Sequence, residues 1–217
     1  LRNAVDLPRL REGGVSCSTS TVYVPIPPLR WTAWGACKRI LDTLDALVER
    51  NADEVVKVDT ARSIRSAHRQ GKLAVLPAVE GGHVIGAKLE RLAQLRERGV
   101  RLLTVTHFIA NRIADAHVGP RVHRGLSAFG REVVRACERL GVVVDLAHAT
   151  ERAFYQTLET ISKPPLVTHT GIRDKGRSER FHSGQQLRDL AQAGGADAAR
   201  LDEALAQARS FARERLQ

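Results

Sequence analysis

Short, continuous apolar runs alternate along the chain with longer segments whose apolar residues recur every three to four positions. Runs of the first kind are typical of strands buried on both faces, and segments of the second kind are typical of helices with one buried face. The runs predict strands over residues 15–24, 73–79, 100–106, 142–147 and 165–168. The periodic segments predict helices over residues 36–50, 61–70, 86–98, 127–140, 151–161 and 185–193.

Glycines and prolines mark the ends of these elements. Gly99 and Gly141 follow two of the expected helices, the usual position for a helix C-cap, and Pro164-Pro165 opens the last expected strand. From residue 73 onward each strand is followed by a helix. This order predicts βα units around a buried parallel sheet, and therefore an α/β fold.

The number of units sets the architecture. A closed eight-stranded α/β barrel typically needs about 250 residues, and this chain has 217. We therefore expect an incomplete (β/α)8 barrel of the metal-dependent hydrolase type, with five to six of eight βα units, over residues 1–195. Residues 196–217 should form an amphipathic helix with Leu201, Leu205 and Phe211 on its apolar face. The sequence starts at Leu1 and contains no Met, so we expect it to lack an upstream segment.

Three of the expected strands lead directly to potential metal ligands. The run 73–79 is followed by Glu80, the run 142–147 by His148, and the run 165–168 by His169. The carboxyl ends of parallel strands in a barrel meet at one rim, where active sites are built. One carboxylate and two imidazoles are a common ligand set for zinc. A single His at a strand end is more often an ordinary polar residue, but three residues at comparable positions favour a metal site.

Charge, cysteine spacing and the lengths of apolar segments limit the classes of protein to which this chain can belong. The net charge of +10 is spread along helix-like segments rather than gathered in a basic run with aromatic residues, so we expect no nucleic-acid partner. Cys17, Cys37 and Cys137 are widely spaced and odd in number, which excludes a zinc knuckle and a disulfide framework. No segment approaches the roughly 20 apolar residues of a membrane span, and no signal peptide is visible. We expect a cytoplasmic protein, with a removed leader left open by the incomplete start.

The residues around these strand ends resemble the membrane (renal) dipeptidase family of zinc metallopeptidases, which have an amidohydrolase-like (β/α)8 barrel. The resemblance rests on four motifs that occur in the family's order: Val79-Glu80-Gly81-Gly82, Thr106-His107 with Asn111, Val144-Asp145-Leu146-Ala147-His148, and Thr168-His169-Thr170. It runs from about Asp6 to Gly195 and so covers most of the chain.

The resemblance implies a role for individual residues. It implies that Glu80 bridges two zinc ions and that His148 and His169 are ligands of the second. It implies that His107 contacts the substrate and stabilises the oxyanion during attack of a metal-activated hydroxide on a dipeptide. Arg180 matches a family Arg that holds the substrate, a role suited to its bidentate fork, although the family's Arg-Asn is Arg180-Phe181 here.

The sequence also departs from the family. The family's first strand ends in a His-x-Asp pair that completes the first zinc site, and a late strand ends in an Asp for proton transfer. Neither motif is found here. Two alternatives to a dipeptidase therefore stay open: an amidohydrolase acting on another amide or a lactam, and a non-catalytic metal-binding or partner-binding remnant. Exposed edges of an incomplete barrel also predict self-association into a homo-oligomer.

We expect structural rather than catalytic roles for other polar residues near the motifs. Asp145 lies three positions before His148, so on a strand it should face away from it, and a structural role is expected. Asn111 should shape the loop after the strand 100–106. No role is assigned from sequence to His83, His117, His123 or His182.

Overall fold

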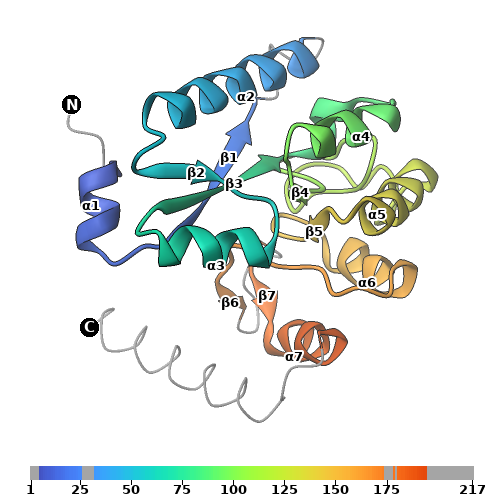
Figure 1. The fold of residues 1–217 in the computed structure, drawn as a ribbon. Helices are drawn as coiled ribbons and strands as arrows, with labels where there is room; N and C mark the ends of the chain where they lie inside the picture. Colours follow the sequence, from blue (N-terminus) through green and yellow to red (C-terminus); the bar gives the residue numbers. More distant parts are fainter. Residues whose placement is uncertain (1–4, 26–31, 174–177, 179, 195–217) are drawn as a thin grey trace.

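The computed structural model describes residues 5–25, 32–173, 178 and 180–194. Its centre is a five-stranded parallel sheet made of β1 (Cys17–Tyr23), β2 (Val55–Lys57), β3 (Leu73–Glu80), β4 (Leu102–Thr104) and β5 (Val143–Asp145). Figure 1 shows the strands in the middle of the molecule, with helices α2, α4, α5 and α6 following one another around the outside. The α/β class and the partial barrel predicted from the sequence are confirmed.

The strands follow the order β1-β3-β4-β5, and β2 pairs with the start of β3. The register puts Glu80 level with both Tyr23 and Thr104, and it puts Thr104 level with Asp145. The carboxyl ends of four strands are therefore aligned at one edge. This alignment brings residues that are far apart in sequence to the same rim.

The helices lie between successive strands, as the alternation predicted. They are α2 (Ala33–Arg50), α3 (Ala61–Arg69), α4 (Glu90–Glu97), α5 (Ala128–Leu140) and α6 (Glu151–Thr160), with a short α1 (Leu7–Glu12) before β1 and α7 (Gly184–Ala193) near the end. Ser127 caps α5 and Thr150 caps α6, each by accepting a bond from a backbone N–H in the first turn. Gly141 ends α5 with φ +66°, a conformation that favours glycine.

The main core lies between the sheet and these outer helices. It consists mostly of Val, Leu, Ile and Ala, and its largest fully buried side chain is Phe154 of α6. Cys37 and Cys137 are buried free thiols within it, and burial raises the pKa of Cys137 to about 12. Cys17 is also a free thiol, but it is only partly buried.

The structure corrects the prediction of a strand over 165–168. This segment makes one parallel bridge, between Leu166 and Asp145, with Leu166 N–H donating to Val144 and its carbonyl accepting from Leu146. Pro165 has no N–H to extend the ladder. Thr168 N–H donates instead to the carboxylate of Asp145. The segment therefore continues the sheet direction without forming a strand.

Other boundaries differ for local reasons. β2 was not predicted, because Lys57 interrupts its apolar run after two residues. The helix expected over 86–98 begins only at Glu90, and a 3-10 helix, η2 (Gly82–Ile85), precedes it. Gly86 lies between them with φ +61°, which interrupts a continuous helix. Two short strands after the rim, β6 (Ile172–Arg173) and β7 (His182–Ser183), were also missed.

The helix expected within residues 196–217 lies outside the described residues. The proposed boundary between it and the barrel therefore stays a prediction. Within the described part of the chain, every helix is too short or too polar to cross a membrane.

Candidate metal centre

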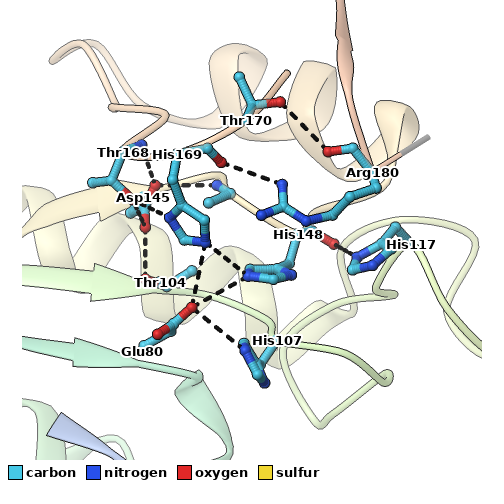
Figure 2. A network of polar contacts seen from close by, with 11 residues as sticks. Glu80, Thr104, His107, His117, Asp145, His148, Thr168, His169, Thr170 and Arg180 are labelled. Carbon is cyan, nitrogen blue, oxygen red and sulfur yellow. Dashed lines mark hydrogen bonds and ion pairs between the residues drawn. The ribbon is translucent and has the colours of Figure 1, made fainter. Parts of the chain in front are cut away.

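Four polar side chains converge at the aligned strand ends, as Figure 2 shows. Glu80 is the last residue of β3, His107 follows β4, His148 follows β5, and His169 follows the bridge at Leu166. The Oε1 atom of Glu80 lies 3.2 Å from His148 Nε2 and 3.4 Å from the Nε2 atoms of His107 and His169. The predicted convergence of Glu80, His148 and His169 is therefore present.

The spacing of three of these residues suits a metal ion. The ligand atoms of Glu80, His148 and His169 all lie within 4.8 Å of one another. The two Nε2 atoms of His148 and His169 are 2.9 Å apart. Nitrogen and oxygen ligands about 2.0–2.1 Å from one tetrahedral ion lie roughly 3.3 Å from each other, so the observed separations fit such an ion. The donor set, two imidazoles and a carboxylate, also fits zinc.

The backbone next to Glu80 explains the paired glycines of its motif. Gly81 has φ +103°, and a Cβ atom there would lie 2.6 Å from the His83 ring. A Cβ at Gly82 would lie 2.8 Å from the Val105 carbonyl oxygen. The chain after Glu80 thus passes close to the segment that leads to His107, and only glycine allows this approach.

His148 lies in a turn beyond β5 and not on the strand itself. Its φ of +67° is unusual for a residue other than glycine. The residue is almost completely buried, at 3% exposure, and its ring packs against the rings of His107 and His169. A strained conformation that the surroundings impose is a common mark of a functional position.

Charge and burial set the protonation of the cluster. The hydrogen bond from His148 is the largest cause that lowers the pKa of Glu80, so this carboxyl is ionised at neutral pH. Burial lowers the pKa of His107 to about 4 and also lowers that of His169. At neutral pH His107 and His169 are therefore uncharged, and neutral imidazole is the form that binds a metal.

A second set of contacts surrounds Asp145, which is fully buried. Its Oδ2 atom accepts hydrogen bonds from the hydroxyls of Thr104, at 2.6 Å, and Thr168, at 2.8 Å. Its Oδ1 atom accepts from the backbone N–H groups of Ala147 and Thr168. Asp145 thus ties β4, β5 and the segment after Leu166 together, in line with the expected structural role. Thr104 and Thr168 were not singled out from sequence, but Thr104 could have been found from the register.

Arg180 lies at the rim of the cluster. Its guanidinium donates to the His169 carbonyl at 3.2 Å, and its charge contributes to the lowered pKa of His169 and of His117. Sequence reasoning missed His117, whose backbone N–H donates to the His148 carbonyl and whose ring lies 5.2 Å from the His148 ring. A His in a polar loop carries no signal of this proximity.

The remaining polar residues singled out in the sequence include Asn111, which was expected to shape the loop after β4. Asn111 donates to the Val105 carbonyl and accepts from Ile113 N–H, which confirms that it shapes this loop. His83 and His123 each bond one backbone carbonyl, at Val24 and Asn111 respectively. These two histidines therefore anchor loops around the cluster.

The fold and the cluster together define an α/β barrel protein with a candidate metal centre at the carboxyl ends of its strands. The family model for membrane dipeptidase, peptidase family M19, matches residues 1–196. The chain therefore belongs to the membrane dipeptidase family, as the motifs predicted.

Individual relatives agree with this assignment. Dipeptidase 3 of Mus musculus is 32% identical over 177 residues, covering 79% of this chain and 35% of that protein. An uncharacterized dipeptidase of Schizosaccharomyces pombe is 31% identical over 194 residues, covering 82% of this chain and 47% of that protein. The chain spans less than half the length of either relative.

Solved structures share the fold. A dipeptidase of family M19, described as a metallopeptidase, has a TM-score of 0.78 at 27% identity, over 87% of this chain and 60% of that one. A metallopeptidase of Rhodobacter sphaeroides, solved with a phosphinate mimic of the dipeptide L-Ala-D-Ala, has a TM-score of 0.78 at 24% identity, covering 87% of this chain and 62% of that one.

Proposed function

We propose that this chain carries the metal-binding part of a zinc-dependent dipeptidase that hydrolyses the peptide bond of dipeptides. The observation that carries the proposal is the convergence of Glu80, His148 and His169 at the aligned strand ends. Membership of a family of metallopeptidases supports metal dependence. The choice of zinc rests on the ligand chemistry, since imidazole and carboxylate together are a common zinc set.

Each residue has a distinct part in the proposed reaction. Glu80, His148 and His169 would hold the ion. A zinc ion there would supply Lewis acidity and would activate water for attack near neutral pH. Because the Glu80 carboxylate has two oxygens, it would also be available as a ligand for a second ion.

The substrate is oriented by groups around the ion. His107 is buried and uncharged at neutral pH, so it can donate a hydrogen bond to a polarised carbonyl oxygen without carrying a charge. Arg180, whose guanidinium donates to the His169 carbonyl, would bind the terminal carboxylate of a dipeptide. The dipeptide mimic bound by the Rhodobacter sphaeroides metallopeptidase supports this substrate class.

The test measures zinc binding and hydrolysis separately. The purified chain is stripped with a chelator, reloaded with zinc, and assayed on dipeptides that contain Ala or Gly. We expect stoichiometric zinc binding and slow hydrolysis, both lost in Glu80→Gln. General acid–base assistance is typically worth about 10²–10⁴ in rate, so the absence of the family's proton-transfer Asp from this sequence predicts the slow turnover. Failure to bind zinc would disprove the proposal.

A second candidate function is metal binding without catalysis. It is favoured by one observation: the sequence contains no His-x-Asp pair, the motif that completes the family's first zinc site. Zinc binding that needs Glu80, with no hydrolysis of any dipeptide, would support this second candidate over the first. Hydrolysis of another amide or a lactam, but not of dipeptides, would change the substrate and keep the metal chemistry.

We further propose a cytoplasmic location and self-association. Buried free thiols at Cys37 and Cys137 suit a reducing compartment. Self-association is supported by Leu166, which is 48% exposed and lies at the end of the described strand order.

A further inference from the structure

The two histidines of the candidate metal centre differ in what their second ring nitrogen contacts. The Nδ1 atom of His148 is buried and has no hydrogen-bond partner among the described residues. The Nδ1 atom of His169 lies 2.9 Å from the Thr168 hydroxyl. A partner on the second nitrogen fixes which nitrogen of a neutral imidazole carries the proton.

The Thr168 hydroxyl has only one proton, and that proton is already used. The hydroxyl donates this proton to Asp145 Oδ2 at 2.8 Å. The same carboxylate receives the Thr104 hydroxyl and two backbone N–H groups, so all its neighbours in this network are donors. The Thr168 oxygen can therefore only accept from His169, whose proton must be on Nδ1.

We infer that Asp145 and Thr168 are positioning residues that hold His169 in the Nδ1–H form, with the lone pair of Nε2 directed at the metal site. The chain of contacts runs from the Asp145 carboxylate through the Thr168 hydroxyl to the His169 ring, and Figure 2 shows it beside Glu80 and His148. His169 needs such a restraint because its side chain is 45% exposed. The inference deepens the proposed function and rests on it for the metal.

The first test does not require a metal. The chelator-treated chain, labelled with ¹⁵N-histidine, is measured by long-range ¹H–¹⁵N correlation at pH 8, with His169→Asn identifying the His169 signals. We expect the His169 proton on Nδ1 in the unaltered chain and in Thr168→Ser, which keeps the hydroxyl. We expect a loss of this preference in Thr168→Val.

Asp145→Asn should move the His169 proton from one ring nitrogen to the other. Its amide would donate to the Thr168 oxygen, which frees the hydroxyl proton to point at His169 Nδ1. The His169 proton should then move to Nε2. Thr170→Val is the matched control, because the Thr170 hydroxyl contacts His182 and not His169. It should leave the His169 signals unchanged.

The second test is zinc affinity, measured by competition with a chromophoric chelator. Outer partners of metal ligands are typically worth 10–100-fold in affinity, so we expect a loss of about that size in Thr168→Val. Thr168→Ser and Thr170→Val should stay within about threefold of the unaltered chain, since both keep the contact to His169. Circular dichroism checks that each variant is folded.

The outcomes separate this inference from the proposed function. A His169 proton on Nε2 in the unaltered chain, or the same tautomer and affinity in Thr168→Val, would overturn the inference even if zinc binds tightly. An Nδ1 proton that depends on Thr168 would support the positioning role even if the chain hydrolyses no dipeptide.

Discussion

The candidate metal centre is built from two regions that hold their ligands in different ways. Glu80 ends β3 and His148 follows β5, and their side chains are only 20% and 4% exposed. His169 follows a segment with one bridge to the sheet, and its side chain is 45% exposed. The first region is held by the sheet and the core. The second is held by the polar contacts of Asp145, Thr168 and Arg180.

Because of this difference, we expect substitutions in the two regions to impair metal binding in different ways. A change in the first region should act through packing or through direct loss of a ligand. A change in the second should act through hydrogen bonds, and it can shift His169 while leaving the core intact. Variants that change one region and leave the other intact can therefore test whether the two regions hold their ligands independently.

The largest effect is expected from Glu80→Gln. Gln removes the negative charge that contacts all three histidines, so zinc affinity should fall by more than the roughly 100-fold typical of an outer partner. Isothermal titration calorimetry measures this. Glu138→Gln is the control, because Glu138 lies in α5 and bonds Ser162 and Lys163 away from the cluster. Equal affinities in both variants would contradict a ligand role for Glu80.

The next effect compares Asp145→Ala with Asp115→Ala. Both carboxylates are fully buried, and Asp115 accepts from the N–H groups of Val122, His123 and Gly125. Each substitution leaves several buried hydrogen-bond donors without an acceptor. Each should therefore lower the free energy of unfolding by about 2–4 kcal/mol in urea titrations. Zinc affinity should fall only in Asp145→Ala. A similar fall in Asp115→Ala would mean that the loss comes from general destabilisation.

A smaller effect is expected from pH. Burial lowers the pKa of His107, which contacts Glu80 of the first region, to about 4. Burial likewise lowers the pKa of His182, which contacts Thr170 beside His169 of the second region, to about 4. Both residues are neutral in the folded chain at neutral pH, whereas in the unfolded chain they take up protons below about pH 6.5. The contribution of these two histidines to stability should therefore be constant above pH 6.5 and fall as the pH drops toward 4, by at most about 3 kcal/mol for each histidine.

Urea titrations at several pH values measure this fall. His182→Gln, which removes the titrating ring, should make the dependence shallower. His68→Gln is the control variant, because His68 is exposed on α3. An unchanged dependence in His182→Gln would contradict the contribution of His182.

The smallest effect on stability is expected from Leu166→Lys. The exposed side chain can be replaced at a cost within about 0.5 kcal/mol. A charge at this sheet edge should oppose pairing with another copy. Sizing chromatography with light scattering should show a lower average mass than for the unaltered chain. A monomer in both cases would contradict the proposed self-association.

The amino-acid sequence was enough to predict the parallel α/β class and the family. Continuous apolar runs before Glu80 and His148, alternating with helical segments, are typical of strands buried on both faces, and the glycines after Glu80 mark a close approach of two backbones. The same reasoning placed Glu80, His148 and His169 at one rim, because parallel strands share their carboxyl edge. The order of apolar and polar residues was sufficient to predict the elements whose residue types are decided by burial alone.

How these ligands are supported follows only from the three-dimensional structure. The bridge at Leu166 in place of a strand and the contacts of Thr104 and Thr168 with Asp145 join residues more than 20 positions apart in the sequence. A hydrogen bond between side chains on separate strands leaves no period in the sequence. It exists only once the register has brought the donor and the acceptor together.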